Sequence, residues 1–240
     1  MAILNQNVEV LADKAALVER AYEITIEQIE KAIAKQDRFT IALAGGSTPK
    51  PLYEALSQAD LPWSKIHIFW GDERYVPADH PDSNQFMVRQ AWLNKIDIPA
   101  ENIHPMHTVG ADPATDAKRH EAELKEFFQI ESGFPQFDLI LLGMGDDGHT
   151  ASLFPQTEAL AVEDSLVTVG NHNGQPRITF TVPLINQADL VVFLVAGENK
   201  RPALKRVFAT QEDAQQYPSR LIQPRGELLW LLDRSAAAEL

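Results

Sequence analysis

The stretch Phe137–Pro155, FDLILLGMGDDGHTASLFP, carries the strongest indication of the fold. Its first part, Phe137–Leu142, is a short and almost wholly apolar run that follows Gly133 and Pro135 and ends at Gly143. Runs of this length between such residues are typical of a strand buried on both faces, as in a parallel sheet covered by helices. The stretch therefore predicts an α/β protein with this strand inside its sheet.

A glycine-rich turn with two aspartates, GMGDDG at residues 143–148, follows the predicted strand, and His149 comes directly after it. Open α/β sheets place their ligands at the carboxyl ends of their strands. A histidine can act as an acid or a base near neutral pH. The aspartates, Asp146 and Asp147, can orient the imidazole ring or bind sugar hydroxyls. We interpret this turn as a catalytic loop, with His149 and Asp147 as candidate catalytic residues.

The same turn matches the dinucleotide-binding pattern G-x-G-x-x-G, and Glu163 and Asp164 follow at the spacing of a ribose-binding acid, roughly twenty residues. Two features argue against a dinucleotide. The two aspartates of the turn would place negative charge where a pyrophosphate should lie. Pro155 would end any helix that starts after the turn within about two turns, so the long helix that should hold the phosphates is missing. No cofactor is predicted.

The composition is that of a globular protein without cysteine. An apolar fraction of 45% is ordinary and sufficient for a sizeable core. No apolar run reaches the length of about eighteen residues that a membrane span needs, and the N-terminus lacks the pattern of a secretory signal. The absence of cysteine excludes disulfides, thiolate metal sites and cysteine nucleophiles. We expect a cytoplasmic protein.

The net charge of −13 limits the partners. It argues against nucleic acid and against anionic membranes. An anionic substrate would need its own local cluster of cations in so acidic a chain. The histidines His104, His107 and His120 have no metal-ligand spacing with one another, so no metal site is predicted.

Apolar runs alternate with helical patterns along the whole chain, and no linker-like change of composition divides it. We therefore predict a single α/β domain, residues 1–240, with a mostly parallel Rossmann-like sheet and helices on both faces. The turn Asn171–Gly174 predicts a hairpin and hence a small antiparallel addition. The predicted strands are Val8–Leu11, Phe39–Ala44, Ile66–Trp70, Phe137–Leu142, Leu166–Val169, Arg177–Val182, Ala188–Val195 and Glu227–Leu232. The predicted helices are Lys14–Gln36, Pro49–Gln58, Gln85–Leu93, Thr115–Phe128 and Pro202–Thr210.

A second glycine turn, Gly45-Gly46-Ser47-Thr48-Pro49, follows the predicted strand Phe39–Ala44. We expect Thr48 to cap the next helix and Pro49 to be its first residue. A strand, a glycine turn and a helix N-terminus together present free backbone N–H groups, which suit a phosphate or a carboxylate. An ordinary capped turn without a ligand is the alternative. The turn is not a Walker A loop, because the G-K-[ST] ending is absent.

Charged residues follow two further predicted strands. Asp72-Glu73-Arg74 comes after Ile66–Trp70 and forms either a solvated loop or part of the same crevice as His149. Arg177 is either a surface residue or one of the cations that the substrate needs. Lys200 comes just before a predicted helix, where both its charge and the helix dipole favour an anion.

Several motifs carry a family resemblance: LAGGSTP at Leu43–Pro49, WGDERYVP at Trp70–Pro77 with Ser83-Asn84 after it, LLGMGDDGHTASLFP at Leu141–Pro155, and RITFTVP at Arg177–Pro183 followed by AGENK at Ala196–Lys200. These motifs and the order of the elements resemble the 6-phosphogluconolactonase family. The resemblance covers most of the chain, and the GHTASLFP segment is its most specific part.

The resemblance implies hydrolysis of 6-phospho-D-glucono-1,5-lactone to 6-phosphogluconate in the oxidative branch of the pentose phosphate pathway. His149 would act as general base on a water, Asp147 would hold the imidazole or a substrate hydroxyl, and Arg74 would offset charge on the carbonyl oxygen. Neither a metal nor a covalent intermediate is required, and Ser152 lacks a G-x-S-x-G elbow. The residues expected to bind the substrate and its phosphate are Gly45, Gly46, Ser47, Thr48, Asp72, Arg177 and Lys200.

Two alternatives remain at this point. The related glucosamine-6-phosphate isomerase/deaminases follow the histidine with an asparagine-glutamate-proline segment, whereas Leu153-Phe154-Pro155 stands here, and an apolar Phe154 cannot move a proton. A non-catalytic sugar-phosphate sensor is the other alternative, although the chain has no second domain to signal to. The expected partner is a small sugar-phosphate lactone; the roles of Asp72 and Glu73 and the oligomeric state stay open.

Overall fold

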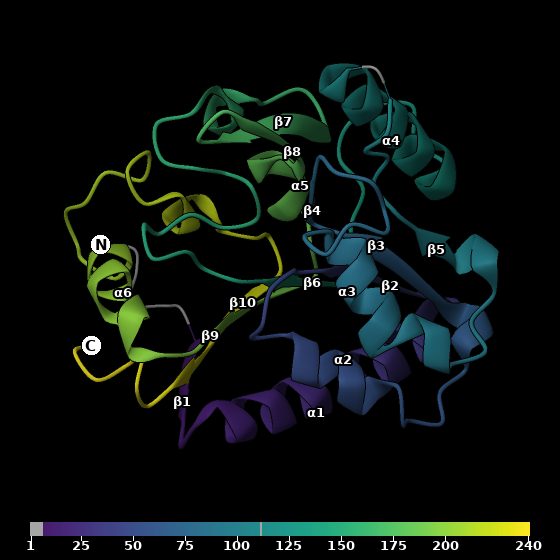
Figure 1. The fold of residues 1–240 in the computed structure, drawn as a ribbon. Helices are drawn as coiled ribbons and strands as arrows, with labels where there is room; N and C mark the ends of the chain where they lie inside the picture. The colour runs from purple at the N-terminus through teal and green to yellow at the C-terminus, as the bar shows by residue number, and fades with distance from the viewer. Residues whose placement is uncertain (1–6, 111) are drawn as a thin grey trace.

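A seven-stranded parallel sheet forms the centre of the protein. The computed structural model describes residues 7–110 and 112–240 (Figure 1). Within them the strand order is β1-β10-β9-β6-β2-β3-β5, and every neighbouring pair is parallel. The strands are β1 (Asn7–Leu11), β2 (Phe39–Leu43), β3 (Ile66–Trp70), β5 (Ile103–His104), β6 (Leu139–Leu142), β9 (Leu190–Val195) and β10 (Glu227–Asp233). The predicted parallel α/β sheet is confirmed.

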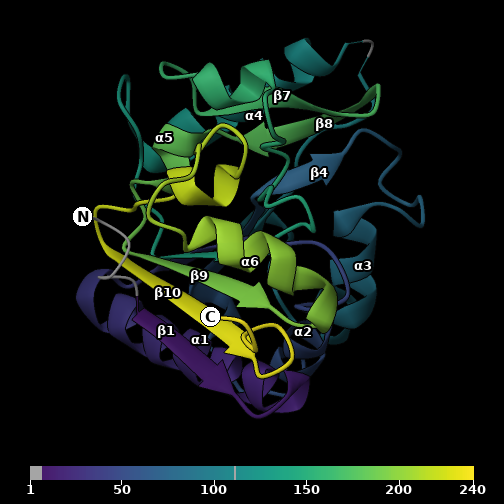
Figure 2. The same ribbon diagram turned by 90° about the vertical axis from the view of Figure 1, so that its left-hand side faces the viewer.

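Helices cover both faces of this sheet, as predicted (Figures 1 and 2). The helices are α1 (Lys14–Gln36), α2 (Lys50–Leu56), α3 (Asn84–Ala91), α4 (Pro113–Phe128), α5 (Val182–Ile185) and α6 (Arg201–Val207). Alternate residues of the wholly buried strand β9 enter different cores. Val191 and Phe193 pack in the core that includes α4 and α6, whereas Val192 and Leu194 pack in the core that includes α1, α2 and α3. An apolar run without alternation is thus what a strand between two helical layers requires.

The helix α1 begins and ends at the predicted residues. Asp13 caps its N-terminus, because its side chain accepts a hydrogen bond from the backbone N–H of Ala16 at 2.9 Å. Asp37 ends it in the left-handed conformation with φ 58°. The helix after β2 differs from the prediction: α2 begins at Lys50, Pro49 stands before it, and no side chain caps it. The prediction that Thr48 is the N-cap is therefore wrong, because residues 47–49 continue the turn instead.

A second, antiparallel sheet with the strand order β4-β8-β7 packs in the core that includes α4 and α6. Its hairpin, β7 (Val167–His172) and β8 (Gln175–Phe180), confirms the predicted antiparallel addition. The third strand, β4 (Asp72–Arg74), was not predicted, because a segment of charged residues has no strand pattern. Backbone pairing with β8 makes it a strand. The addition is a separate sheet and does not extend the main one.

A pair of histidines lies at the β5 edge of the main sheet. His67 Nδ1 and His104 Nε2 are 3.1 Å apart, and the His104 ring stacks on Phe69 with its centroid 4.3 Å away. Burial lowers the pKa of His104 to about 4, and the charges of His67 and His120 act in the same direction, against Glu123. Burial also lowers the pKa of His67, as does the charge of Arg38. The folded pair therefore favours neutral rings.

We expect this pair to make the protein less stable in mild acid. The unfolded chain binds a proton at His104 near pH 6.5, whereas the folded chain binds it only near pH 4. Between these values the unfolded state holds more protons, so the free energy of unfolding falls as the pH falls. For His104 we expect a fall of about 1 to 2 kcal/mol, because solvent screens part of the effect at a partly exposed ring. Urea unfolding of the protein and of His104→Phe at several pH values checks this. An unchanged pH slope in the variant would contradict it.

Candidate active site

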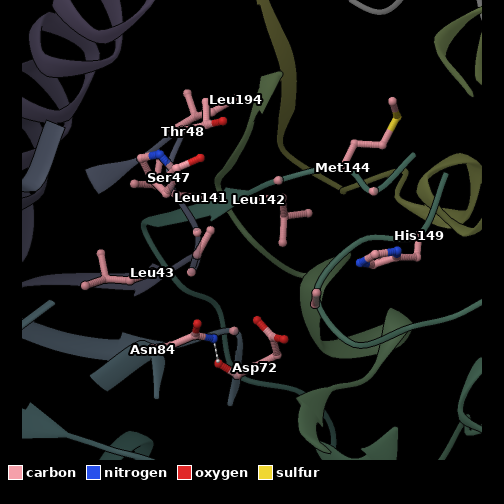
Figure 3. Close-up of a pocket in the computed structure, with 18 of the residues that line it drawn as sticks. Leu43, Ser47, Thr48, Asp72, Asn84, Leu141, Leu142, Met144, His149 and Leu194 are labelled. Atoms are coloured by element: carbon pink, nitrogen blue, oxygen red, sulfur yellow. Dashed lines mark hydrogen bonds between the residues drawn. The ribbon is translucent and has the colours of Figure 1, made fainter. Parts of the chain in front are cut away.

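A cavity of about 420 Å³ opens at the carboxyl ends of the central strands, beside the small antiparallel sheet (Figure 3). Its walls come from the segments that follow β2, β3, β6 and β9, together with β4 and β8. Figure 3 shows His149 on one side of the cavity, across from Ser47 and Thr48. The predicted site residues that line it are Gly45, Gly46, Ser47, Thr48, Asp72, Arg74, His149, Arg177 and Lys200. Asp147 does not line the cavity but contacts His149.

Asp147 holds the imidazole ring of His149. The His149 Nδ1 lies 2.6 Å from Asp147 Oδ1, which also accepts a hydrogen bond from the His149 backbone N–H at 3.0 Å. Burial raises the pKa of Asp147, but these hydrogen bonds and the charge of the ring outweigh it and lower the pKa to about 2. An ionised carboxylate can only accept, so Nδ1 carries a proton. In the neutral ring Nε2 then holds a lone pair, as a general base requires.

Backbone contacts fix the loop that carries this pair. Gly148 has φ +82°, a conformation that favours glycine, and its carbonyl oxygen accepts hydrogen bonds from the Ser219 N–H at 3.0 Å and Oγ at 2.9 Å. The Gly145 N–H donates to the His149 carbonyl oxygen at 2.9 Å. The next regular element described after β6 is a short 3₁₀ helix, Glu158–Ala161. The long helix of a dinucleotide site does not follow β6, as predicted from Pro155.

Phe154 packs against the imidazole ring of His149. Its centroid lies 4.4 Å from that of His149 and 4.6 Å from that of His172. The apolar Phe154 ring thus restricts the imidazole on one side. A carboxylate in its place, as in the deaminase segment, would be a second group able to transfer protons. The sequence indicated only that Phe154 cannot transfer a proton, and its contact with His149 is seen only in the structure.

Two arginines face the cavity from directly opposite positions of the small sheet. Arg74 on β4 pairs in register with Arg177 on β8. Burial lowers the pKa of Arg177, and the charge of Arg74 lowers it further, against the opposing effect of nearby carboxylates. Arg74 Nη1 donates to the Asp82 carbonyl oxygen at 2.5 Å, and neither guanidinium forms an ion pair with any residue in the described part of the chain. Like charges facing each other destabilise a strand pair, so the arrangement favours a bound anion.

Lys200 reaches the same cavity from the segment after β9. Its Nζ lies 2.6 Å from Asp146 Oδ1, and the Asn199 side chain donates to the same oxygen at 2.9 Å. The Lys200 side chain is 19% exposed, and Asp146 pairs with it and not with either arginine. Asp146, whose role the sequence left open, is thus a partner of Lys200.

The turn after β2 presents backbone donors to the cavity. Among residues 7–110 and 112–240, no acceptor is found for the backbone N–H groups of residues 45–48. Lys14 Nζ donates to the Ser47 carbonyl oxygen at 2.8 Å, and the Tyr53 hydroxyl donates to the Ala44 carbonyl oxygen at 2.7 Å. These bonds hold the turn from outside and leave its N–H groups available.

Asp72 and Glu73 have different surroundings, although they are neighbours in sequence. Asp72 lines the cavity, and its Oδ2 accepts a hydrogen bond from the buried Ser152 hydroxyl at 2.6 Å. Glu73, 3% exposed, accepts hydrogen bonds at 2.7 Å from the backbone N–H groups of Arg74, Asn84 and Gln85. Burial raises the pKa of Glu73 in spite of these donors. The solvated-loop alternative is wrong, and Glu73 is an anchor for the start of α3.

The sequence named Asn84 only as part of a family motif and did not predict that it lines the cavity, where it is buried. It also missed that Ser152 supports Asp72. Neither has a periodic or spacing signal, because each contacts a segment distant in sequence. Within the described ranges there is no helix with the length and hydrophobicity to cross a bilayer, and no group of three or more side chains that could ligate a metal.

Known proteins are similar to this chain over nearly its whole length. A family model described as Glucosamine-6-phosphate isomerases/6-phosphogluconolactonase matches residues 12–230. A 6-phosphogluconolactonase of Synechocystis sp. is 63% identical over 97% of this chain and 98% of its own length. One of Nostoc sp. is 60% identical over 99% of each.

The structure of 6-phosphogluconolactonase from Trypanosoma cruzi superposes with a TM-score of 0.86 and 30% identity, over 98% of this chain and 97% of that one. A monomeric glucosamine-6-phosphate deaminase, 20% identical with a TM-score of 0.82, shares the fold. The resemblance found in the sequence motifs is confirmed. The chain belongs to the glucosamine-6-phosphate isomerase/6-phosphogluconolactonase family.

Proposed function

We propose that the protein hydrolyses 6-phospho-D-glucono-1,5-lactone to 6-phospho-D-gluconate, the lactone-opening step of the oxidative pentose phosphate pathway. One observation carries the proposal: the His149–Asp147 pair shares a cavity with Arg74, Arg177 and Lys200. A base aimed into a cationic cavity suits the attack of water on an anionic ester. The relatives named 6-phosphogluconolactonase support the same assignment.

His149 is the general base in this proposal. Its Nε2 takes a proton from a water as the water oxygen bonds to the lactone carbonyl carbon. The carbonyl oxygen becomes an oxyanion, and Arg74 offsets its charge. Collapse of the tetrahedral intermediate breaks the bond from that carbon to the ring oxygen. The ring oxygen then takes the proton from the imidazolium, so the base is regenerated and the product is an open-chain carboxylic acid. This acid loses its proton to solvent near neutral pH and becomes the carboxylate.

The substrate phosphate is assigned to the opposite part of the cavity. The backbone N–H groups of residues 45–48 would donate to its oxygens, and Arg177 and Lys200 would supply positive charge. Asp72 would accept a hydrogen bond from a sugar hydroxyl through the carboxylate oxygen that Ser152 does not occupy. These groups supply the local cations that a protein of net charge −13 needs for an anionic substrate.

The deaminase alternative is disfavoured by the ring that contacts His149. Opening an amino sugar ring needs a second proton-transfer group, and Phe154 has none. A non-catalytic sensor is disfavoured because the pair His149–Asp147 has the geometry of a base and its orienting acid.

The test is hydrolysis of freshly generated 6-phosphogluconolactone, corrected for its spontaneous opening. We expect a large acceleration that needs no nucleotide. Ammonia release from glucosamine 6-phosphate without lactone hydrolysis would replace the proposal with the deaminase function. Sugar-phosphate binding without either activity would replace it with the sensor function.

We expect Arg177→Met to weaken substrate binding without weakening the fold. The loss of a charge-assisted contact should raise KM by roughly tenfold to a hundredfold. The free energy of unfolding should stay equal or rise slightly, because the repulsion with Arg74 disappears. Steady-state kinetics and urea unfolding measure the two effects. The exposed Arg225, on the segment before β10, provides the control Arg225→Met, and equal KM values for both variants would contradict the prediction.

A further inference from the structure

Asn84, the first residue of α3, has a buried amide whose oxygen is unpaired. The residue is 2% exposed, and its Nδ2 donates to the Asp72 carbonyl oxygen at 2.9 Å (Figure 3). Its Oδ1 is buried and has no hydrogen-bond partner among the residues that the structure describes. An unsatisfied buried oxygen destabilises a fold, so its presence beside a cavity needs a physical reason.

The amide of Asn84 lies directly against Gly45. A Cβ at position 45 would be 1.9 Å from Oδ1, 2.4 Å from Cγ and 2.7 Å from Nδ2 of Asn84. The φ of Gly45 lies outside the left-handed region, so its backbone conformation would accept an alanine. The need for glycine at this position therefore comes from Asn84 and not from backbone strain.

We propose that Asn84 is a positioning residue that sets the distance between the Gly45–Thr48 turn and Asp72. One end of its amide is hydrogen-bonded to the Asp72 backbone, and the rest packs on the turn. The N–H groups of the turn have no acceptors among the residues that the structure describes, so packing of this kind determines where they point. The inference rests on the proposed function, because it takes the turn as the phosphate-binding element.

The unpaired oxygen follows from this arrangement. Turning the amide over would place Oδ1 against the Asp72 carbonyl oxygen, and two acceptors would then face each other. The amide keeps the orientation that holds Asp72, and its oxygen remains against Gly45. The orientation that leaves Asn84 Oδ1 without a hydrogen bond is thus the one that holds both Asp72 and the Gly45–Thr48 turn in place.

Calorimetric titration of inorganic phosphate into a double-mutant cycle tests the proposal. We expect Gly45→Ala to lower phosphate affinity by roughly tenfold, because the methyl group displaces the amide and the turn. Asn84→Ala should also lower it, because the turn loses its support. In the Asn84→Ala background, however, Gly45→Ala should cause no further loss, because the methyl group enters the vacated space. In steady state, Asn84→Ala should raise KM roughly tenfold and change kcat by less than about threefold.

Gly46→Ala is the matched control. Gly46 has φ +94°, and a Cβ there meets no atom within 4 Å. The Gly46→Ala variant should lose phosphate affinity through backbone strain, and this loss should persist in full when Asn84 is also replaced. Thermal unfolding establishes that each variant is folded, and Asn84→Ser replaces Asn84→Ala in the cycle if the alanine variant does not fold.

Additive losses for Gly45→Ala and Asn84→Ala would overturn the inference while the unaltered protein still binds phosphate and hydrolyses the lactone. Failure of the unaltered protein to bind phosphate would instead overturn the assignment of the turn, and this inference with it. A kcat loss without a KM change in Asn84→Ala would also overturn it, since a misplaced phosphate site acts on binding.

Discussion

His149→Ala is expected to lower kcat by roughly a hundredfold to ten-thousandfold, the range that general base catalysis contributes. The variant loses the group whose Nε2 would take a proton from the attacking water. Stability should change by less than about 1 kcal/mol, because the ring is partly exposed and its hydrogen bond to Asp147 lies at the surface. Lactone hydrolysis under saturating substrate and urea unfolding measure the two quantities.

His172→Ala is the control for this variant. The His172 ring also packs on Phe154, at 4.6 Å, but lies 6.5 Å from the His149 ring and does not line the cavity. We expect it to keep a kcat near that of the unaltered protein. A folded His149→Ala protein with a nearly full rate would rule out His149 as the base.

Gly145→Ala is expected to cause a loss of kcat of similar order, although it changes no reacting group. A Cβ at position 145 would lie 2.1 Å from His149 Nδ1, 2.2 Å from its Cε1 and 2.7 Å from Asp147 Oδ1. The methyl group must therefore push the imidazole out of its hydrogen bond with Asp147. The φ of Gly145 lies outside the left-handed region, so the backbone itself accepts the substitution. A misplaced base by itself can cost roughly a hundredfold in rate.

Gly143→Ala separates this effect from the general effect of a methyl group in the loop. A Cβ there meets no atom of the described residues within 4 Å. Because Gly143 lines the cavity, its substitution can change KM, so the comparison uses kcat and the downfield NMR signal of the His149 Nδ1 proton. We expect the signal to persist in Gly143→Ala and to disappear in Gly145→Ala. An unshifted signal and an unchanged kcat in Gly145→Ala would show that the loop adapts to the methyl group.

The sequence predicted the central sheet well because burial on two faces leaves a local pattern. The strand β9 is six consecutive buried residues, and its run of apolar side chains identifies it directly. The helix α1 has the spacing of one buried face, and its capping residue Asp13 precedes it by one position. Such features depend on residues a few positions apart, so they can be recognised without the tertiary structure.

The strand β4 and the start of α2 could not be predicted in the same way. The residues of β4 carry charges, and they form a strand only because β8 offers backbone partners. Glu73 is stable in the interior because amides at the start of α3 surround its carboxylate. Thr48 is a residue type that commonly caps helices, but the turn that it belongs to continues through Pro49, and α2 begins only at Lys50. For β4 and Glu73, a contact between distant segments overrides the local preference.

The sequence by itself determined which side chains follow the central strands, and hence which groups are candidates for the site. Because the carboxyl ends of parallel strands meet at one edge of a sheet, His149 and Lys200 had to lie on the same side of the protein. Only the tertiary structure decided which side chain each of them contacts. Asp146 and Lys200 are 54 residues apart in the chain, and their 2.6 Å contact depends on how two separate loops pack. Local sequence patterns encode burial, whereas contacts between loops depend on the whole fold that brings them together.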